Sequence, residues 1–319
     1  MIDKTRLIAP DDAGLAEAAG LIRAGQLVAF PTETVYGLGA DARNDRAVAA
    51  IFDAKGRPRF NPLIAHLPDV EAARTIAEFT PKAEALAAAF WPGPLTLVLA
   101  QRDGAGISPL VTADLPTVAL RVPAHPLARA LLRAVGGPVA APSANPSGRI
   151  SPTRADHVME GLRDRIAAVI DGGACDVGVE STIVGFDAEG RAVLLRPGGI
   201  SAEAIETVLG EPLVAGGNAT APNAPGQLES HYAPEAAVRL NAGDPREGEF
   251  RLGFGRGECD LNLSPSGDLV EAAANLFHYL READRRAGPG AVIAVAPIPE
   301  TGLGRAINDR LRRAAAPRP

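Results

Sequence analysis

Short apolar runs recur along this 319-residue chain, and segments with the periodicity of amphipathic helices separate them. The runs at 27–30, 95–99 and 138–141 have the length of buried strands. Between such runs, apolar residues return every three or four positions, for example over 15–22 and 48–52. Strands that alternate with helices predict an α/β fold. With 46% apolar residues, the chain can bury a sizeable core.

Polar residues follow two of these apolar runs directly. Thr34 belongs to the segment after the run at 27–30, and Ser143 and Asn145 follow the run at 138–141. Open α/β sheets bind ligands just beyond the ends of their strands, and a loop rich in Ser and Gly can present backbone N–H groups to phosphate. Both segments are therefore candidates for ligand contact, and the alternative for each is an ordinary polar turn.

A basic loop lies between the second predicted helix and a short apolar run. Lys55, Arg57 and Arg59 fall within five residues, and the glycine and proline between them exclude a helix. The following run ends in His66. Only three of the 32 basic residues are lysines, so a lysine here suggests that a compact point charge is needed. Such a loop could hold a polyanion, or it could be a solvated basic turn.

Two arginines lie inside or at the end of apolar runs. Arg121 sits in the run 117–123, and Arg196 ends the run 193–196. A buried arginine is very costly without an anionic partner. For Arg121 that partner could be a structural carboxylate or a carboxylate of the substrate, because arginine makes bidentate pairs with either.

Composition narrows the class of protein. The net charge is −6, so any contact with nucleic acid must be local. No apolar run approaches the roughly 20 residues that span a bilayer, and no membrane association is expected. The two cysteines are far apart in sequence, which argues against a zinc site or a disulfide scaffold and is consistent with a reducing cytoplasm.

A change in composition divides the chain into a domain at 1–212, a linker at 213–234 and a small α/β domain at 235–319. The linker is rich in glycine and proline but ends in the amphipathic cluster His231-Tyr232-Ala233-Pro234. In the small domain, strands again alternate with helices, which predicts a three-layer α/β unit. The residues of this unit suggest no chemistry.

The basic loop, the polar loops and the buried arginines of the first domain together match a ligand that carries both phosphate and carboxylate groups. Phosphoryl-type chemistry mainly requires positioning and neutralisation of charge, and the chain has no Ser-His-Asp or Cys-His pattern. Acidic clusters are few, so Mg²⁺ would arrive on the nucleotide phosphates rather than in a site of the protein. The residues alone therefore indicate a nucleotide-using enzyme.

The motifs taken together resemble the threonylcarbamoyl-AMP synthase family in its long, two-domain form. The resemblance rests on PTETVYGLGADA (31–42), KGRPRFNPL (55–63), WPGPLTLVL (91–99), APSANPSGR (141–149), GVESTIV (178–184) and LRPGGIS (195–201). It implies a YrdC-like fold, which is a twisted, mostly parallel α/β sheet with a concave positive face. A smaller Rossmann-like domain would follow.

The resemblance also implies a reaction, in which L-threonine, bicarbonate and ATP, with Mg²⁺ carried by ATP, give threonylcarbamoyl-AMP and pyrophosphate. The product would serve the threonylcarbamoyladenosine modification at tRNA position 37, completed by a separate transferase. The tail domain could bind tRNA or that transferase.

By resemblance, Lys55 and Arg57 would be catalytic and would stabilise charge on the phosphates. The other ATP-binding residues would be Asn61, Thr117, Ser143, Asn145, Ser151, Arg196 and Tyr232. Threonine would be held by Thr34, His66, Arg121 and Ser181. Tyr232 would fold back from the linker and close the cavity, because excluding water protects the labile carbamate and the mixed anhydride.

Two alternatives remain at this point. A carbamoyl-adenylate-forming enzyme of the hydrogenase-maturation type shares the YrdC-like domain, but it carries CxxC zinc motifs and an acylphosphatase domain that this chain lacks. An RNA-binding module could use the basic face to hold a phosphate backbone, although the net negative charge disfavours it.

Overall fold

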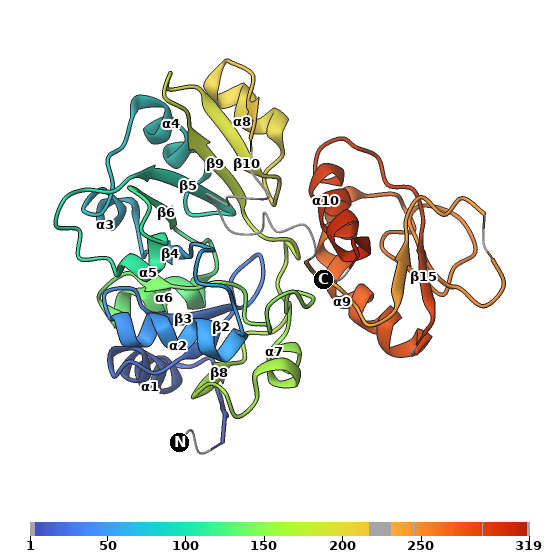
Figure 1. Cartoon of the computed structure of the whole chain (residues 1–319), viewed down its shortest axis with the longest axis horizontal. Coiled ribbons are helices and arrows are strands. Elements are labelled where there is room, and N and C mark those ends of the chain that lie inside the picture. The colour runs from blue at the N-terminus through green and yellow to red at the C-terminus, as the bar shows by residue number, and fades with distance from the viewer. Residues whose placement is uncertain (1–3, 217–230, 245, 289, 318–319) are drawn as a thin grey trace.

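The computed structural model describes residues 4–216, 231–244, 246–288 and 290–317, which form a large lobe and a small lobe (Figure 1). Residues 217–230 of the predicted linker lie outside the described residues, and the predicted domain boundaries remain predictions. No helix in the described ranges is long and apolar enough to cross a membrane.

The large lobe combines one sheet with short helices on its faces. Its strands are β1 (Arg6–Ile8), β2 (Val28–Phe30), β3 (Gly37–Asp41), β4 (Ile64–His66), β5 (Leu95–Ala100), β6 (Thr117–Arg121), β7 (Val139–Ala140), β8 (Ala168–Ile170), β9 (Thr182–Phe186), β10 (Ala192–Arg196) and β11 (Val214–Ala215). Its helices are α1 (Asp12–Arg23), α2 (Asp45–Lys55), α3 (Val70–Arg74), α4 (Pro81–Phe90), α5 (Pro109–Thr112), α6 (Pro126–Val135), α7 (Ala155–Leu162) and α8 (Ala202–Leu209).

The strand order of this sheet is β1-β8-β2-β3-β7-β4-β6-β5-β9-β10-β11. The α/β class is confirmed. The expectation of parallel strands holds for five of the ten pairings between described strands, and the other five are antiparallel. The register of β4 and β6 places His66 opposite Arg121. An isolated bridge joins Gly37 to Ser143, so the two polar segments identified in the sequence lie side by side.

Local capping explains where the helices of the large lobe begin. Asp11 accepts a hydrogen bond from the backbone N–H of Gly14 at the start of α1, and Asn44 accepts from Arg46 and Ala47 at the start of α2. α2 ends at Gly56, whose φ of 60° lies in the left-handed region that favours glycine. These ends fix where the basic loop leaves the helix.

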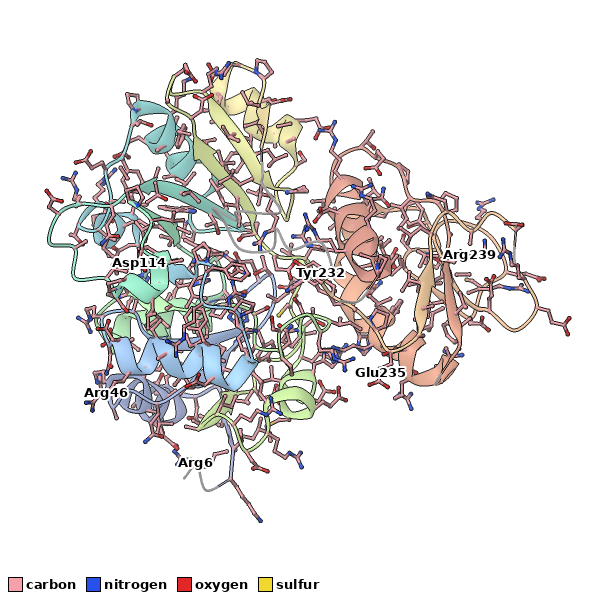
Figure 2. The ribbon with its side chains drawn as sticks, in the orientation of Figure 1. Arg6, Arg46, Asp114, Tyr232, Glu235 and Arg239 are labelled. Carbon is pink, nitrogen blue, oxygen red and sulfur yellow. The ribbon has the colours of Figure 1, made fainter. Side chains whose placement is uncertain are left out.

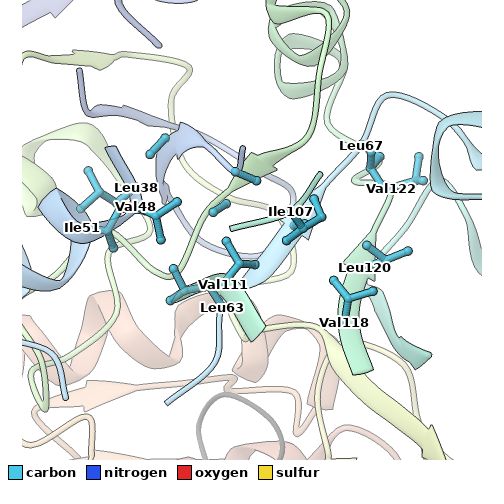
Figure 3. Close-up of a cluster of buried hydrophobic side chains, with 14 of the residues drawn as sticks. Leu38, Val48, Ile51, Leu63, Leu67, Ile107, Val111, Val118, Leu120 and Val122 are labelled. Carbon is cyan, nitrogen blue, oxygen red and sulfur yellow. The ribbon is translucent and has the colours of Figure 1, made fainter. Parts of the chain in front are cut away.

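The main core lies between the sheet and the helices that cover it. Figure 3 shows part of this core, where Leu38 of β3, Val48 and Ile51 of α2, and Leu120 of β6 belong to one buried cluster. These side chains are fully shielded from solvent. The apolar residues at helical spacing in the sequence therefore anchor α2, and through it the basic loop, against the sheet.

The small lobe has a sheet of four described strands in the order β12-β15-β13-β14, and all of its pairings are parallel. Its elements are β12 (Ala237–Arg239), β13 (Phe250–Gly253), β14 (Leu261–Asn262), α9 (Leu269–Ala287), β15 (Val292–Val295) and α10 (Gly304–Ala315). The second, smaller α/β unit is confirmed. Its two described helices pack against each other on the side that faces the large lobe, so they form one layer (Figure 1).

The two lobes share a core. Val35, Ile150 and Val179 of the large lobe belong to the same buried cluster as Phe277 of α9 and Ile307 of α10. Tyr232 belongs to this cluster too and lies where the lobes meet (Figure 2). Since these residues bury each other, the small lobe forms part of the wall around anything bound at the junction.

Candidate active site

A small cavity of about 50 Å³ lies at the junction of the two lobes. Its wall contains residues from the segment after β2, from β4, β6 and β10, and from the end of the linker. The predicted site residues that line it are Thr34, Arg57, His66, Arg121, Ser143, Ser181, Arg196 and Tyr232. Segments far apart in the sequence therefore converge on one place.

The other predicted site residues do not line this cavity; they are Lys55, Asn61, Thr117, Asn145 and Ser151. Of these, Lys55 and Ser151 bond to the lining residues Ser143 and Glu180. Asn145 belongs to the Ser143 loop, where its Nδ2 donates to the carbonyl of Arg149 at 2.8 Å. Thr117 begins β6 and pairs with Ala100, at the opposite end of the strand from Arg121. The structure thus separates Thr117 from the cavity by the length of that strand.

Lys55 is buried and holds the Ser143–Asn145 loop. Its Nζ donates to the carbonyl oxygen of Ser143 at 2.6 Å and to that of Asn145. In turn, the N–H of Ser147 donates to the carbonyl of Lys55 at 2.8 Å. Burial, and then the nearby charge of Arg57, lower the pKa of Lys55 well below its usual range. Lys55 therefore sets the shape of the loop that carries Ser143 into the cavity.

Arg57 lines the cavity and also braces its own loop. Its guanidinium donates to the carbonyls of Asn61 at 3.3 Å and Pro62 at 3.0 Å. Burial and the neighbouring Arg196 lower the pKa of Arg57 to about 10, so it stays cationic at neutral pH. The Oδ1 atoms of Asn61 and Asn145 are buried and have no hydrogen-bond partner in the described structure. Buried polar atoms of this kind are candidates for contact with a ligand or water.

Arg121 has a structural carboxylate as its partner. Its Nη2 donates to Oε1 of Glu33 at 2.7 Å, and its Nη1 donates to the hydroxyl of Thr34 at 2.9 Å. Burial alone would raise the pKa of Glu33, but the attraction of Arg121 and its hydrogen bond lower it overall. Of the two partners left open by the sequence, the structure supplies Glu33, and it also aims Arg121 at the cavity.

His66 and Ser181 lie on the same cavity. The Nδ1 atom of His66 is 3.3 Å from the carbonyl of Ile64, and burial, with the nearby Arg121, lowers the pKa of His66 to about 3. His66 is therefore neutral at physiological pH. The hydroxyl of Ser181 is 2.7 Å from that of Thr96 and accepts from Arg196 at 3.2 Å. Neighbouring hydrogen bonds thus fix the orientation of Ser181.

Arg196 reaches the cavity from the end of β10. Its guanidinium donates twice to the carbonyl of Ser181, at 2.9 and 3.2 Å. Burial lowers the pKa of Arg196 to about 10. With Arg57 and Arg121, three guanidinium groups line the cavity, and the only carboxylate among its described lining residues is Glu180. The site therefore suits an anion.

Sequence reasoning missed several residues of this site. Glu33 and Glu180 lie inside two of the recognised motifs, PTETVYGLGADA (31–42) and GVESTIV (178–184), but neither was predicted as a site residue. Arg310 of α10 donates from Nε to Oε2 of Glu180 at 2.8 Å, but it looks in the sequence like any residue of a basic helix. His231 lines the cavity beside Tyr232, within the cluster that the sequence did single out.

Tyr232 closes the cavity from the side of the small lobe. Its ring stacks on Phe277 at a centroid distance of 5.3 Å, and only 1% of the residue is exposed. The backbone N–H of Ala233 bonds to Gly148 of the large lobe, and that of His231 bonds to Arg313 of the small lobe. Burial raises the pKa of Tyr232 to about 12, so its hydroxyl keeps its proton.

Burial lowers the pKa of all five histidines, to about 3 for His66 and His231 and about 4 for His157. In an unfolded chain the value is about 6.5, so the folded state binds fewer protons below that pH. The free energy of unfolding should therefore fall as the pH drops from 7.5 to 5, a window that lies above the usual pKa of carboxylates.

Urea titrations at the two pH values would measure this loss. A His157→Phe variant should lose less stability between them than the unmodified chain does. An unfolding free energy that stays constant or rises at pH 5 would contradict the prediction.

Two family models match consecutive parts of this chain. Residues 20–198 match the family described as "Telomere recombination", and residues 200–316 match the family described as "Threonylcarbamoyl-AMP synthase, C-terminal domain". A threonylcarbamoyl-AMP synthase of Bacillus subtilis is 43% identical over 99% of this chain and 97% of its own length. The chain belongs to the threonylcarbamoyl-AMP synthase family.

Solved structures agree with this membership. The crystal structure of Sua5 from Pyrococcus abyssi complexed with L-threonine has a TM-score of 0.87 and 42% identity, and the match covers 98% of each chain. The structure of Escherichia coli YciO has a TM-score of 0.55 and 22% identity, covering 62% of this chain and 96% of its own, and shows the fold of the large lobe alone. The match to this synthase family extends over both lobes.

Proposed function

We propose that this chain is an L-threonylcarbamoyladenylate synthase, a nucleotidyltransferase that makes threonylcarbamoyl-AMP and pyrophosphate from L-threonine, bicarbonate and ATP. The observation that carries the proposal is the convergence of Arg57, Arg121 and Arg196 on one cavity. Membership of the family supports it, and so does the L-threonine bound to the Pyrococcus abyssi relative.

The cavity offers two groups of contacts for such substrates. Arg121, Thr34, His66 and Ser181 would hold threonine, with Arg121 on its carboxylate. Arg57, Arg196 and Ser143 would face the ATP phosphates, while Lys55 and Asn145 would keep the Ser143 loop in place. Because the pKa of His66 is about 3, His66 would act as a neutral hydrogen-bonding group and not as the base for the amine.

The reaction would proceed without a covalent enzyme intermediate. Bicarbonate would take up a proton and release water to give CO₂. The amine of threonine would then add to the carbon of CO₂: a C–N bond forms, one C=O π bond opens onto a carbamate oxygen, and the amine releases the proton that replaces the one bicarbonate took up. An oxygen of the carbamate then attacks the α-phosphorus in line, and the bond from that phosphorus to the bridging oxygen of pyrophosphate breaks. Arg57 and Arg196 would stabilise the charge that builds up on the phosphates as pyrophosphate leaves.

The residues of the cavity do not form a site for a metal ion. Both oxygens of Glu180 are engaged, one by Ser151 at 2.6 Å and the other by Arg310 at 2.8 Å. The described residues contain no group of three or more side chains that could hold a metal. We therefore assign no step to Mg²⁺, which would arrive with ATP and keep several waters.

The cavity of the described structure is too small for the substrates. Its volume is about 50 Å³, whereas pockets for ligands of drug size measure about 300–1,000 Å³. The segment around Tyr232 would have to move away for ATP to enter and return to exclude water.

The product would pass to a threonylcarbamoyl transferase that modifies tRNA at position 37. The reaction would then take place in the cytoplasm.

A direct assay tests the proposal. The protein is incubated with ATP, Mg²⁺, bicarbonate and single amino acids, and the adenylate and pyrophosphate are followed by rapid chromatography with mass detection. We expect an adenylate that requires both threonine and bicarbonate. In a parallel incubation, carbamoyl phosphate replaces bicarbonate and the amino acid, and an adenylate formed there would support the carbamoyl-transfer alternative. RNA binding that weakens steeply with salt, without any adenylate, would support the RNA-binding alternative.

Replacing Tyr232 by alanine should increase the loss of reaction intermediates to hydrolysis. The ring fills the wall of the cavity and stacks on Phe277, so its removal would admit water to the carbamate and to the mixed anhydride. We expect the ratio of pyrophosphate to recovered adenylate to rise at least about threefold. Tyr232→Phe keeps the ring and is the matched control. A ratio that is equal in both variants would show that the ring does not seal the cavity.

A further inference from the structure

Glu180 is an acidic residue in a cavity that three arginines also line. It is the only carboxylate among the described lining residues, and it faces the same space as Arg57 and Arg196. Burial acts to raise its pKa, but Arg310 and Arg196 attract the charged form, and the pKa of Glu180 falls to about 2. The carboxylate is therefore charged at any working pH, and its charge opposes the binding of phosphate groups.

Arg310 compensates this charge from the other lobe. Its Nε donates to Oε2 of Glu180 at 2.8 Å, and its Nη1 donates to the carbonyl of Pro197 and to Oδ2 of Asp309, both at 2.8 Å. Asp309 also pairs with Arg313 at 3.1 Å, which leaves Arg310 available to compensate Glu180. Its guanidinium also lies over the ring of Tyr232, 5.5 Å from the centroid. Only 1% of Arg310 is exposed, which makes it one of the largest fully buried side chains of the described structure.

We propose that Arg310 of the small lobe is a positioning residue for the nucleotide phosphates, which acts by neutralising Glu180 and so keeps the cavity cationic. This inference deepens the proposed function and rests on it for the identity of the ligand. Without Arg310, Glu180 would attract Arg196, the other cation that lowers its pKa, and would draw this guanidinium away from an anionic ligand.

The arrangement links ligand binding to the docking of the small lobe. Glu180 has its full set of partners only when α10 lies against the large lobe, because Ser151 binds one oxygen and Arg310 the other. A cavity with an undocked small lobe would present an uncompensated carboxylate to the phosphates. Anion affinity would therefore rise as the lobe docks, and a bound anion would in turn favour docking.

Calorimetric titrations with inorganic pyrophosphate, ATP and L-threonine test the proposal on four variants of the full chain. These are Arg310→Met, Glu180→Gln, the double variant, and Arg305→Met. Arg305 lies on the same helix and pairs with Glu203 of the large lobe at 3.0 Å, outside the cavity. It is the matched control for a loosened interface, and thermal unfolding of each variant shows whether the fold is kept.

We expect Arg310→Met to weaken pyrophosphate and ATP about tenfold or more, because it leaves a buried carboxylate without its cation. The affinity of Arg310→Met for threonine should change by less than about threefold. Arg305→Met should leave all three affinities within about twofold of the wild-type values. The double variant should regain most of the anion affinity, since Glu180→Gln removes the charge that Arg310 compensates.

Two results would overturn the proposal. One is unchanged pyrophosphate affinity in a folded Arg310→Met variant. The other is a double variant as weak as Arg310→Met, which would show that Arg310 acts by packing and not through the charge of Glu180. A wild-type protein that makes no adenylate would overturn the proposed function instead, and the pyrophosphate series would still decide the role of Arg310.

Discussion

Replacing Lys55 by methionine should reduce pyrophosphate release at least about hundredfold while the protein stays folded. The ammonium group holds the carbonyls of Ser143 and Asn145, so its loss would let the loop that carries Ser143 shift away from the phosphates. Stability should change by less than about 3 kcal/mol, because two effects oppose each other. The two carbonyls lose their partner, but a costly buried charge is also removed.

Steady-state pyrophosphate release and urea unfolding together measure this outcome. Lys82→Met is a suitable control, because Lys82 forms an ion pair with Glu211 at 2.5 Å on the surface of the same lobe. It should retain full turnover. If Lys55→Met turned over as fast as Lys82→Met, the loop would not need the ammonium group, and the role proposed for Lys55 would fail.

Replacing Arg121 by methionine should weaken threonine binding about hundredfold and leave ATP binding within about threefold, since a bidentate arginine–carboxylate contact is among the stronger polar interactions. The change should also cost about 3–5 kcal/mol of stability, because Glu33 would be left buried without its cation. Calorimetry with each substrate and urea unfolding would measure the two effects separately.

The double variant Glu33→Gln, Arg121→Met separates the structural role of Arg121 from its role in binding. We expect it to recover most of the lost stability, because neither charge is then buried alone. Threonine binding should stay weak. If the double variant bound threonine as well as wild type does, the carboxylate of threonine would have another partner in the cavity.

Local signals in the sequence were sufficient to predict many elements of the fold but not their neighbours, and β3 (Gly37–Asp41) was not predicted. Asn44 and the apolar spacing of Val48 and Ile51 predict α2, and the structure confirms it. The direction and neighbours of β7 depend on pairings such as Ala40 with Ala140, which are a hundred positions apart. An apolar run indicates burial, but it does not say which strand it pairs with or in which direction.

The sequence likewise predicted residues of the candidate site but not the contacts between them. Arg121 could be recognised as a buried cation that needs an anion, yet only the fold shows that Glu33 is that anion. Motifs identified Ser143 and Lys55, but the sequence did not show that the ammonium of Lys55 bonds to the loop itself. Arg310 was missed because nothing in an amphipathic basic helix distinguishes the arginine that is buried against Glu180 of the other lobe.

The pairing of Glu180 with Arg310 has a consequence for the order of events during synthesis of the chain. The two residues are 130 positions apart, and a ribosome adds about 5–20 residues per second. Roughly 7–26 seconds therefore pass between the incorporation of the carboxylate and that of its guanidinium partner. For most of this interval the growing chain holds Ser143 and Arg196 but lacks the helix that carries Arg310. A nascent large lobe would thus be unable to shelter a carbamate from water until the small lobe has been made.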